Sequence, residues 1–245
     1  MKTWQQVWTL VGVKFKQSFA SVKISPMIYI TILYPVIINF ILPNDVSSIE
    51  RQGFVMIMFF SFLGSVSPIT LAMLNLTEDK EHKTLRILLD SHVRPWVYLL
   101  SLVIMTQITM WVTVMISLPL MNLDYQYLGS IFGMIFHFGM CFLISSILGL
   151  IFGLIFDRSA TANAASIVPM LAIAFIPLFS RMNDHLAGLM PYFYTGRANA
   201  WLLHLDYGNL GIDFLIYGVW LLASLIVLTI SYRQKRNRLY RSRSE

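Results

Sequence analysis

The sequence predicts an all-α integral membrane protein, and three observations carry that prediction. Of the 245 residues, 57% are apolar and only 12% are charged, whereas soluble domains carry about 25% charged residues. Mean hydropathy is +0.67. The charged residues leave six uncharged stretches, each long enough to cross a bilayer as a helix. These stretches are continuously apolar and lack the alternation of a β-barrel wall.

The chain divides into an N-terminal segment, residues 1–25, and a six-span unit, residues 26–245. The spans are expected at about 26–43, 54–76, 96–121, 129–156, 160–180 and 212–232. Six spans place both termini on one side. If that side is the cytoplasm, 15 Lys and Arg residues lie inside and three outside, which is a decisive positive-inside bias. We therefore predict a multi-pass protein of the cell membrane with both termini inside.

Residues 1–25 are predicted to form an amphipathic helix that lies in the membrane interface. Apolar residues recur there at helical spacing, and Lys2, Lys16 and Lys23 fall on the other face. The apolar positions are Trp4, Val7, Trp8, Val11, Phe15, Phe19 and Val22. The basic tail after Tyr232 is interpreted as an anchor on anionic lipid and not as a nucleic-acid site.

The inner loop, residues 77–95, is long enough to fold. Asn75 or Thr77 is a candidate N-cap, and acidic residues follow it in what would be the first turn of a helix. Lys80, Lys83 and Arg86 have the spacing to pair with those acids along the same helix. Two interpretations stay open: a solvated linker, or a helix that docks on a cytoplasmic partner.

The outer segment, residues 182–210, is too apolar for an exposed loop and too interrupted for a further span. It is expected to form short re-entrant helices that protein shields from lipid, with a break at Met190-Pro191.

The sequence contains none of the motifs of the common hydrolases. It lacks GxxxxGK[ST], HExxH and GxSxG, and its single cysteine, Cys141, excludes a cysteine metal cluster. We predict no enzymatic activity, no metal and no cofactor in this chain. His137 is the one ionisable residue expected at mid-membrane depth, either as a proton relay or as a hydrogen-bonding group between helices. The fifth span, with a small polar inner half and two prolines, is a candidate wall or gate of a path.

The stretch from Glu78 to Leu100 resembles the signature loop of type-2 ABC exporter permeases. The matching positions are Glu81, Thr84, Leu85, Leu88, Leu89, Ser91, Val93 and Arg94. Three positions depart from the family pattern: Lys83 replaces a usual Gly, His92 replaces a small residue, and Met190-Pro191 replaces an outer Asn-Pro pair. The order of interfacial helix, six spans, long inner loop and re-entrant segment is also similar to that family.

The resemblance implies a permease that dimerises with a second copy or a related permease and docks two cytoplasmic ABC ATPase subunits. ATP and Mg would act on those partners. The implied coupling residues are Glu78, Glu81, Thr84, Leu85, Arg86, Leu88, Leu89 and Arg94. The family's path lies between protomers, and the candidate lining residues are Asn39, Phe62, Ser65, Asn163, Ser166, Met170 and Phe175.

The expected substrate is amphipathic or hydrophobic, since 14 Met and 17 Phe residues suit an adaptable apolar path. Members with this loop pattern include bacterial exporters of peptide toxins such as phenol-soluble modulins, and of bacteriocins, which favours peptide export from a bacterium. Drug or lipid export by the same family is an alternative. An ion-coupled carrier and a non-transporting immunity or scaffold protein are the alternatives from other classes.

Overall fold

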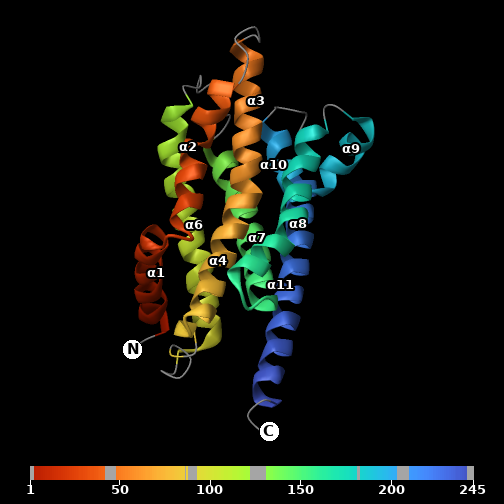
Figure 1. Cartoon of the computed structure of the whole chain (residues 1–245). Coiled ribbons are helices and arrows are strands. Elements are labelled where there is room, and N and C mark those ends of the chain that lie inside the picture. The colour runs from red at the N-terminus through yellow and green to blue at the C-terminus, as the bar shows by residue number, and fades with distance from the viewer. Residues whose placement is uncertain are drawn as a thin grey trace.

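The computed structural model describes residues 3–41, 48–85, 87, 93–121, 131–180, 183–202 and 210–241, and every regular element in them is helical (Figure 1). The prediction of an all-helical protein is thus confirmed. Two short elements differ from α-helix, the π-helix η1 and the 3-10 helix η3. The elements are α1 (Thr3–Ala20), α2 (Ser25–Ile41), α3 (Ser48–Ser61), η1 (Phe62–Val66), α4 (Ser67–Glu81), α6 (Pro95–Leu120), α7 (Ile131–Ile155), α8 (Ser159–Phe179), α9 (Asp184–Leu189), η3 (Met190–Tyr192), α10 (Tyr194–Leu202) and α11 (Leu210–Arg241).

Within the described ranges, five helices are long and apolar enough to span a membrane. They run over Gly53–Glu81, Pro95–Leu120, Phe132–Ile155, Ser159–Phe179 and Leu210–Gln234. The first span expected from the sequence corresponds to α2, which the structure describes over 17 residues and which is bent by 75° from α1. Pro26 lies in the first turn of α2, where a proline costs no hydrogen bond.

The long helix formed by α3, η1 and α4 is at the centre of the bundle. Of its apolar window 78% is buried, whereas α11 buries only 11% of its own. The backbone of α7 comes very close to this central helix, because a Cβ added at Gly149 would lie 2.3 Å from the Ile69 carbonyl oxygen. Small residues at such crossings let membrane helices pack backbone to backbone.

The inner loop begins later than the sequence predicted. Asn75 and Thr77 do not cap a new helix, because α4 continues through them to Glu81, and both are buried in it. The acidic residues therefore lie in the last turns of α4, not in the first turn of a loop helix. Their partners are on other elements, which offsets the unfavourable position of acids at the negative end of a helix dipole.

Helix α1 packs on the bundle with a face that includes Val7 and Val11 of the predicted apolar face and three residues outside it. Its buried residues are Val7, Leu10, Val11, Lys14 and Ser18. Trp4 and Trp8 stay 65% and 57% exposed. Some apolar residues of α1 therefore pack against the protein and others lie on its surface. Lys14 is buried because its ammonium group pairs with the buried carboxylate of Asp79.

The outer segment folds as two short helices, α9 and α10, which meet at η3 (Met190–Tyr192), where the sequence predicted a break. Helix α10 is buried along most of its length, including Tyr194, Thr195 and Asn199. Figure 1 shows α9 and α10 at one end of the bundle and the end of α4, the start of α1 and the end of α11 toward the other.

Candidate functional site

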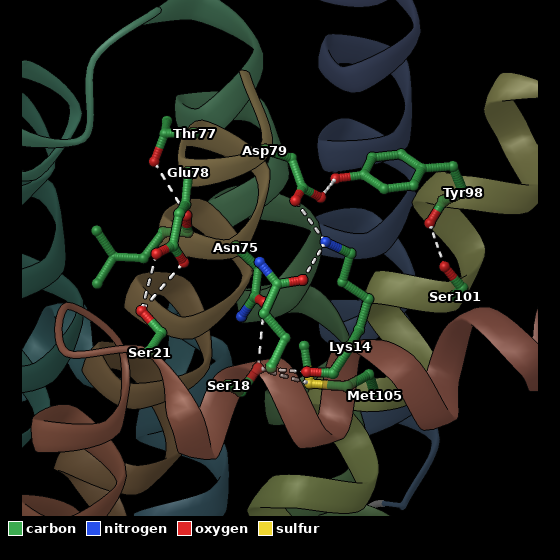
Figure 2. A network of polar contacts seen from close by, with 12 residues as sticks. Lys14, Ser18, Ser21, Asn75, Thr77, Glu78, Asp79, Tyr98, Ser101 and Met105 are labelled. Carbon is green, nitrogen blue, oxygen red and sulfur yellow. Dashed lines mark hydrogen bonds and ion pairs between the residues drawn. The ribbon is translucent and has the colours of Figure 1, made fainter. Parts of the chain in front are cut away.

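A buried ion pair joins α1 to the end of α4. Lys14 Nζ lies 2.5 Å from Asp79 Oδ1, and the Tyr98 hydroxyl of α6 donates a hydrogen bond to the other carboxylate oxygen (Figure 2). The Lys14 and Asp79 side chains are 2% and 0% exposed. Such a pair stabilises only when hydrogen bonds satisfy its remaining atoms, and here Gln17 Oε1 also accepts from Lys14 at 2.7 Å.

Two more polar contacts extend this joint along α1. Ser18 Oγ donates to Asn75 Oδ1 at 3.1 Å, and Ser21 Oγ lies 2.9 and 3.1 Å from the two carboxylate oxygens of Glu78 (Figure 2). Asn75 also donates to the Leu71 carbonyl oxygen. Helix α1 and Ser21, the residue after it, are therefore fixed to the last two turns of α4 by polar contacts.

Lys80 connects the end of α4 to the end of α7. Its Nζ donates to the carbonyl oxygens of Gly153, Leu154 and Phe156 at 2.6, 2.9 and 3.0 Å, and lies 3.5 Å from Asp157 Oδ1. These carbonyls close α7 and have no partner within the helix, so a cation there satisfies them and complements the negative end of the helix dipole.

Glu81 connects the same turn of α4 to the start of α8. Its Oε1 accepts from the Ser159 backbone N–H at 2.6 Å and from Ser159 Oγ at 2.7 Å, while Oε2 lies 2.5 Å from Lys23 Nζ. The carboxylate thus lies at the positive end of α8, which favours a negative charge. The hydrogen bond with Glu81 raises the pKa of Lys23 above its usual value, so this lysine stays charged.

Two neighbouring residues of α4 thus bind the two helix ends on either side of the short turn between α7 and α8. Together with the Lys14 joint, they make the end of α4 a common attachment for α1, α6, α7 and α8. These contacts are hydrogen bonds and ion pairs that join helices. Among the described residues, no group of three or more His, Cys, Asp or Glu could hold a metal ion.

The predicted coupling residues fall into three groups. Glu78 and Glu81 point to other helices of the bundle, as described above. Thr84 and Leu85 are half-buried, and Arg94 is exposed just before α6. Arg86, Leu88 and Leu89 lie outside the described residues.

Lys83 has a backbone φ of 60°, in the left-handed region. This is the position at which the resembling family usually has glycine. A glycine adopts that conformation without steric cost, so the geometry gives a physical reason for the family's choice.

The predicted path residues are on three elements, α2, η1 and α8, and they differ in exposure. Ser65 and Ser166 are buried and donate to the carbonyl oxygens of Ser61 and Asn163 in their own helices. Met170 is also buried, with its sulfur 3.4 Å from Thr70 Oγ1. The other four residues are less enclosed: Asn39, Phe62 and Phe175 are half-buried, and Asn163 is exposed on α8.

His137 is held between helices. Its Nδ1 is 2.9 Å from the Tyr217 hydroxyl of α11, and its ring is stacked on Trp201 of α10 with a centroid distance of 5.2 Å. Arg197 and Asp213 form an ion pair between the same two helices. This supports the interpretation of His137 as a hydrogen-bonding group between helices.

The sequence analysis missed Lys14, Asp79 and Tyr98 as partners. One signal was present: Lys14 has the helical spacing of Val7, Leu10, Val11 and Ser18, so it lies on the packed face of α1.

A protein-family model described as ABC-2 family transporter protein matches residues 14–232, which is most of the chain. The chain therefore belongs to that family, whose members are the membrane permease components of ABC transporters and not their ATPases. No curated protein matches the chain with significant similarity.

Proposed function

We propose that this ABC-2 family protein is the permease subunit of an ATP-driven exporter that moves amphipathic or hydrophobic molecules, with peptide toxins or antimicrobial peptides as the first candidates. Two cytoplasmic ABC ATPase subunits bind the chain after α4, and a second copy or a related permease completes the transporter. ATP and Mg act on the ATPase subunits. The observation that carries the proposal is the attachment of the last turns of α4 to α1, α6, α7 and α8.

That attachment supports a coupling role for residues 77–95. A partner that binds the segment after Glu81 would displace the end of α4. Lys80 and Glu81 would pass that displacement to the end of α7 and to the start of α8, through five hydrogen bonds to Gly153, Leu154, Phe156 and Ser159. Alternating access needs such a two-state rearrangement of packed helices.

Helix α8 is the element on which this displacement acts most directly. It presents small and polar residues on its exposed face, including Asn163, Ala164 and Ala165, and it contains Pro169 and Pro177. A helix interrupted by prolines bends more easily than a regular one. These features suit a moving wall of a path in the bilayer.

The substrate proposal depends on composition. Methionine and phenylalanine side chains adapt to apolar ligands of varied shape, so a chain with 14 Met and 17 Phe residues suits a path for such molecules. Drugs and lipids have the same character and are the alternatives that the assay below separates from peptides.

The test is reconstitution with an ABC ATPase, for which the products of genes adjacent to this chain's gene are the first candidates. We expect the two proteins to co-purify, and we expect one class in a panel of amphipathic peptides, lipids and drugs to stimulate ATP hydrolysis. Charge reversal by Glu81→Lys should lower that stimulation and transport severalfold, because it removes the hydrogen bonds to Ser159 at the start of α8. A hydrogen bond to a charged group contributes about 1.5–3 kcal/mol. Membrane insertion should be unchanged. Asp184→Lys is the matched control, since Asp184 is exposed on α9 at the other end of the bundle.

Failure to co-purify with the ATPase, or unchanged coupling in Glu81→Lys, would contradict the proposal. Transport that continues without nucleotide and stops in His137→Ala would indicate an ion-coupled carrier. Stable complexes in which no substrate stimulates ATP hydrolysis would favour a scaffold or immunity protein.

A further inference from the structure

Helix α10 is hydrogen-bonded to a carbonyl group that a proline leaves without a helical partner. Pro177 has no N–H, so it cannot donate to the carbonyl oxygen of Ile173, four residues earlier in α8. Thr195 Oγ1 of α10 donates to that oxygen at 2.7 Å, and the contact is buried. A side chain from another helix therefore supplies the hydrogen bond that Pro177 removes.

The same arrangement occurs on the central helix. Pro68 cannot donate to the Gly64 carbonyl oxygen, four residues earlier in η1. Ser145 Oγ of α7 donates to this oxygen at 2.7 Å, and Ser145 Oγ also lies 2.6 Å from the Tyr194 hydroxyl of α10. Isolated π-helical turns such as η1 are frequent at functional sites.

Two further contacts hold α10 in place. Asn199 Nδ2 donates to Ser61 Oγ at 2.6 Å, and Cys141 Sγ lies 3.5 Å from the Tyr194 carbonyl oxygen. A Cβ added at Gly196 would lie 2.0 Å from the Met190 carbonyl oxygen, so only glycine allows the start of α10 to pack against η3. We call Ser145, Tyr194, Thr195 and Asn199 the outer clip.

We propose that the outer clip is a releasable joint, in which Thr195 and Ser145 are positioning residues that fix the bends of α8 and of the central helix. While α10 is docked, the two proline-interrupted helices are held together at this end. When α10 leaves, the Ile173 carbonyl oxygen loses its donor and Ser145 Oγ loses its contact with the Tyr194 hydroxyl, so the two helices are free to bend apart. Its role in opening a transport path rests on the proposed function; the joint itself does not.

Alkylation of Cys141 can report the release of α10. Cys141 is the single cysteine, it is fully buried, and it contacts α10 directly. A Cβ added at Gly64 would lie 3.6 Å from Cys141 Cβ and 3.9 Å from Thr195 Cγ2. Cys141 and Thr195 therefore lie against the same glycine of the central helix. Because the thiol is buried against Tyr194 of α10, movement of α10 away from α7 makes it more accessible to a reagent.

The experiment measures alkylation of Cys141 by N-ethylmaleimide, using the full chain in lipid nanodiscs and mass spectrometry. Thr195→Val should accelerate alkylation about tenfold or more, because a buried carbonyl without a donor shifts the local equilibrium toward opening. Thr113→Val is the matched control: Thr113 is equally buried, but its hydroxyl donates to Thr109 in its own helix. It should leave the rate near that of the wild type.

Restoring the missing N–H separates the clip from general loss of packing. Pro177→Ala supplies a backbone donor for the Ile173 carbonyl oxygen, so Thr195→Val should have a much smaller effect in that background. If Thr195→Val alone does not fold, the double variant should be recovered.

The proposal is overturned if Thr195→Val behaves like Thr113→Val, or if Pro177→Ala does not reduce its effect, whether in alkylation rate or in recovery of folded protein. The assay contains neither ATPase nor substrate. A negative result would thus leave the exporter proposal standing, and failure of the ATPase reconstitution would leave the clip standing.

Discussion

Lys14→Met tests the buried joint between α1 and α4. The substitution keeps an unbranched side chain, one atom shorter, but leaves the Asp79 carboxylate buried without its cation, with the Tyr98 hydroxyl still donating to it. Breaking a buried ion pair by removing one partner costs about 3–5 kcal/mol. For a chain of this size, that corresponds to a fall of about 6–20 °C in the thermal midpoint.

The assay is thermal unfolding in detergent, followed by tryptophan fluorescence. Lys16→Met is the matched control, because Lys16 is on the same helix but exposed, and its midpoint should change little. The double variant Lys14→Met/Asp79→Leu should be more stable than Lys14→Met, since it no longer buries an unpaired charge. It should remain below the wild type by about 1–3 kcal/mol, because the Tyr98 hydroxyl loses its acceptor.

Two results would refute this reasoning. One is a Lys14→Met midpoint equal to that of Lys16→Met. The other is a double variant as unstable as the sum of Lys14→Met and Asp79→Leu, because independent costs would mean that the two charges do not compensate each other.

Two further substitutions follow from backbone geometry. Gly149→Ala should destabilise the protein by about 1–3 kcal/mol, because its Cβ would meet the Ile69 carbonyl oxygen at 2.3 Å and force α7 away from the central helix; a thermal midpoint no lower than that of the wild type would contradict this packing. Lys83→Gly should raise the thermal midpoint. Relief of the left-handed strain adds about 1 kcal/mol to the free energy of unfolding, and the greater entropy of the unfolded glycine chain offsets part of that gain. Lys16→Gly, in the interior of α1, is the control and should lower the midpoint.

The helical fold could be predicted from the sequence because a charged residue is costly in the bilayer wherever it occurs, whatever its distant contacts are. Each uncharged stretch therefore marks a helix, and the predicted limits of 96–121 and 160–180 lie within two residues of α6 and α8. The break at Met190-Pro191 could also be predicted, because proline restricts the backbone wherever it occurs.

The candidate site could be predicted only in part, because its contacts join distant segments. The acidic residues after Leu76 were recognised as a group, yet their partners were expected three or four residues away on the same helix. Asp79 instead pairs with Lys14, 65 residues earlier, and Glu81 binds Ser159, 78 residues later. Helical spacing cannot reveal such pairs. The same holds for the outer clip: Pro68 and Pro177 can be read from the sequence, but the side chains that donate in their place, Ser145 and Thr195, cannot be inferred from it.

The joints at the two ends of the bundle act on the same pair of helices. At one end, Glu81 of α4 binds the first residue of α8. At the other end, α10 binds α8 through Thr195 and reaches the central helix through Tyr194 and Ser145. A displacement of α4 relative to α8 at one end would act on the contacts at the other through these two helices, although Pro68 and Pro169 let each of them bend. In the proposed exporter, this mechanical link would let binding of an ATPase at the end of α4 change the stability of the outer clip without a contact between the two sites.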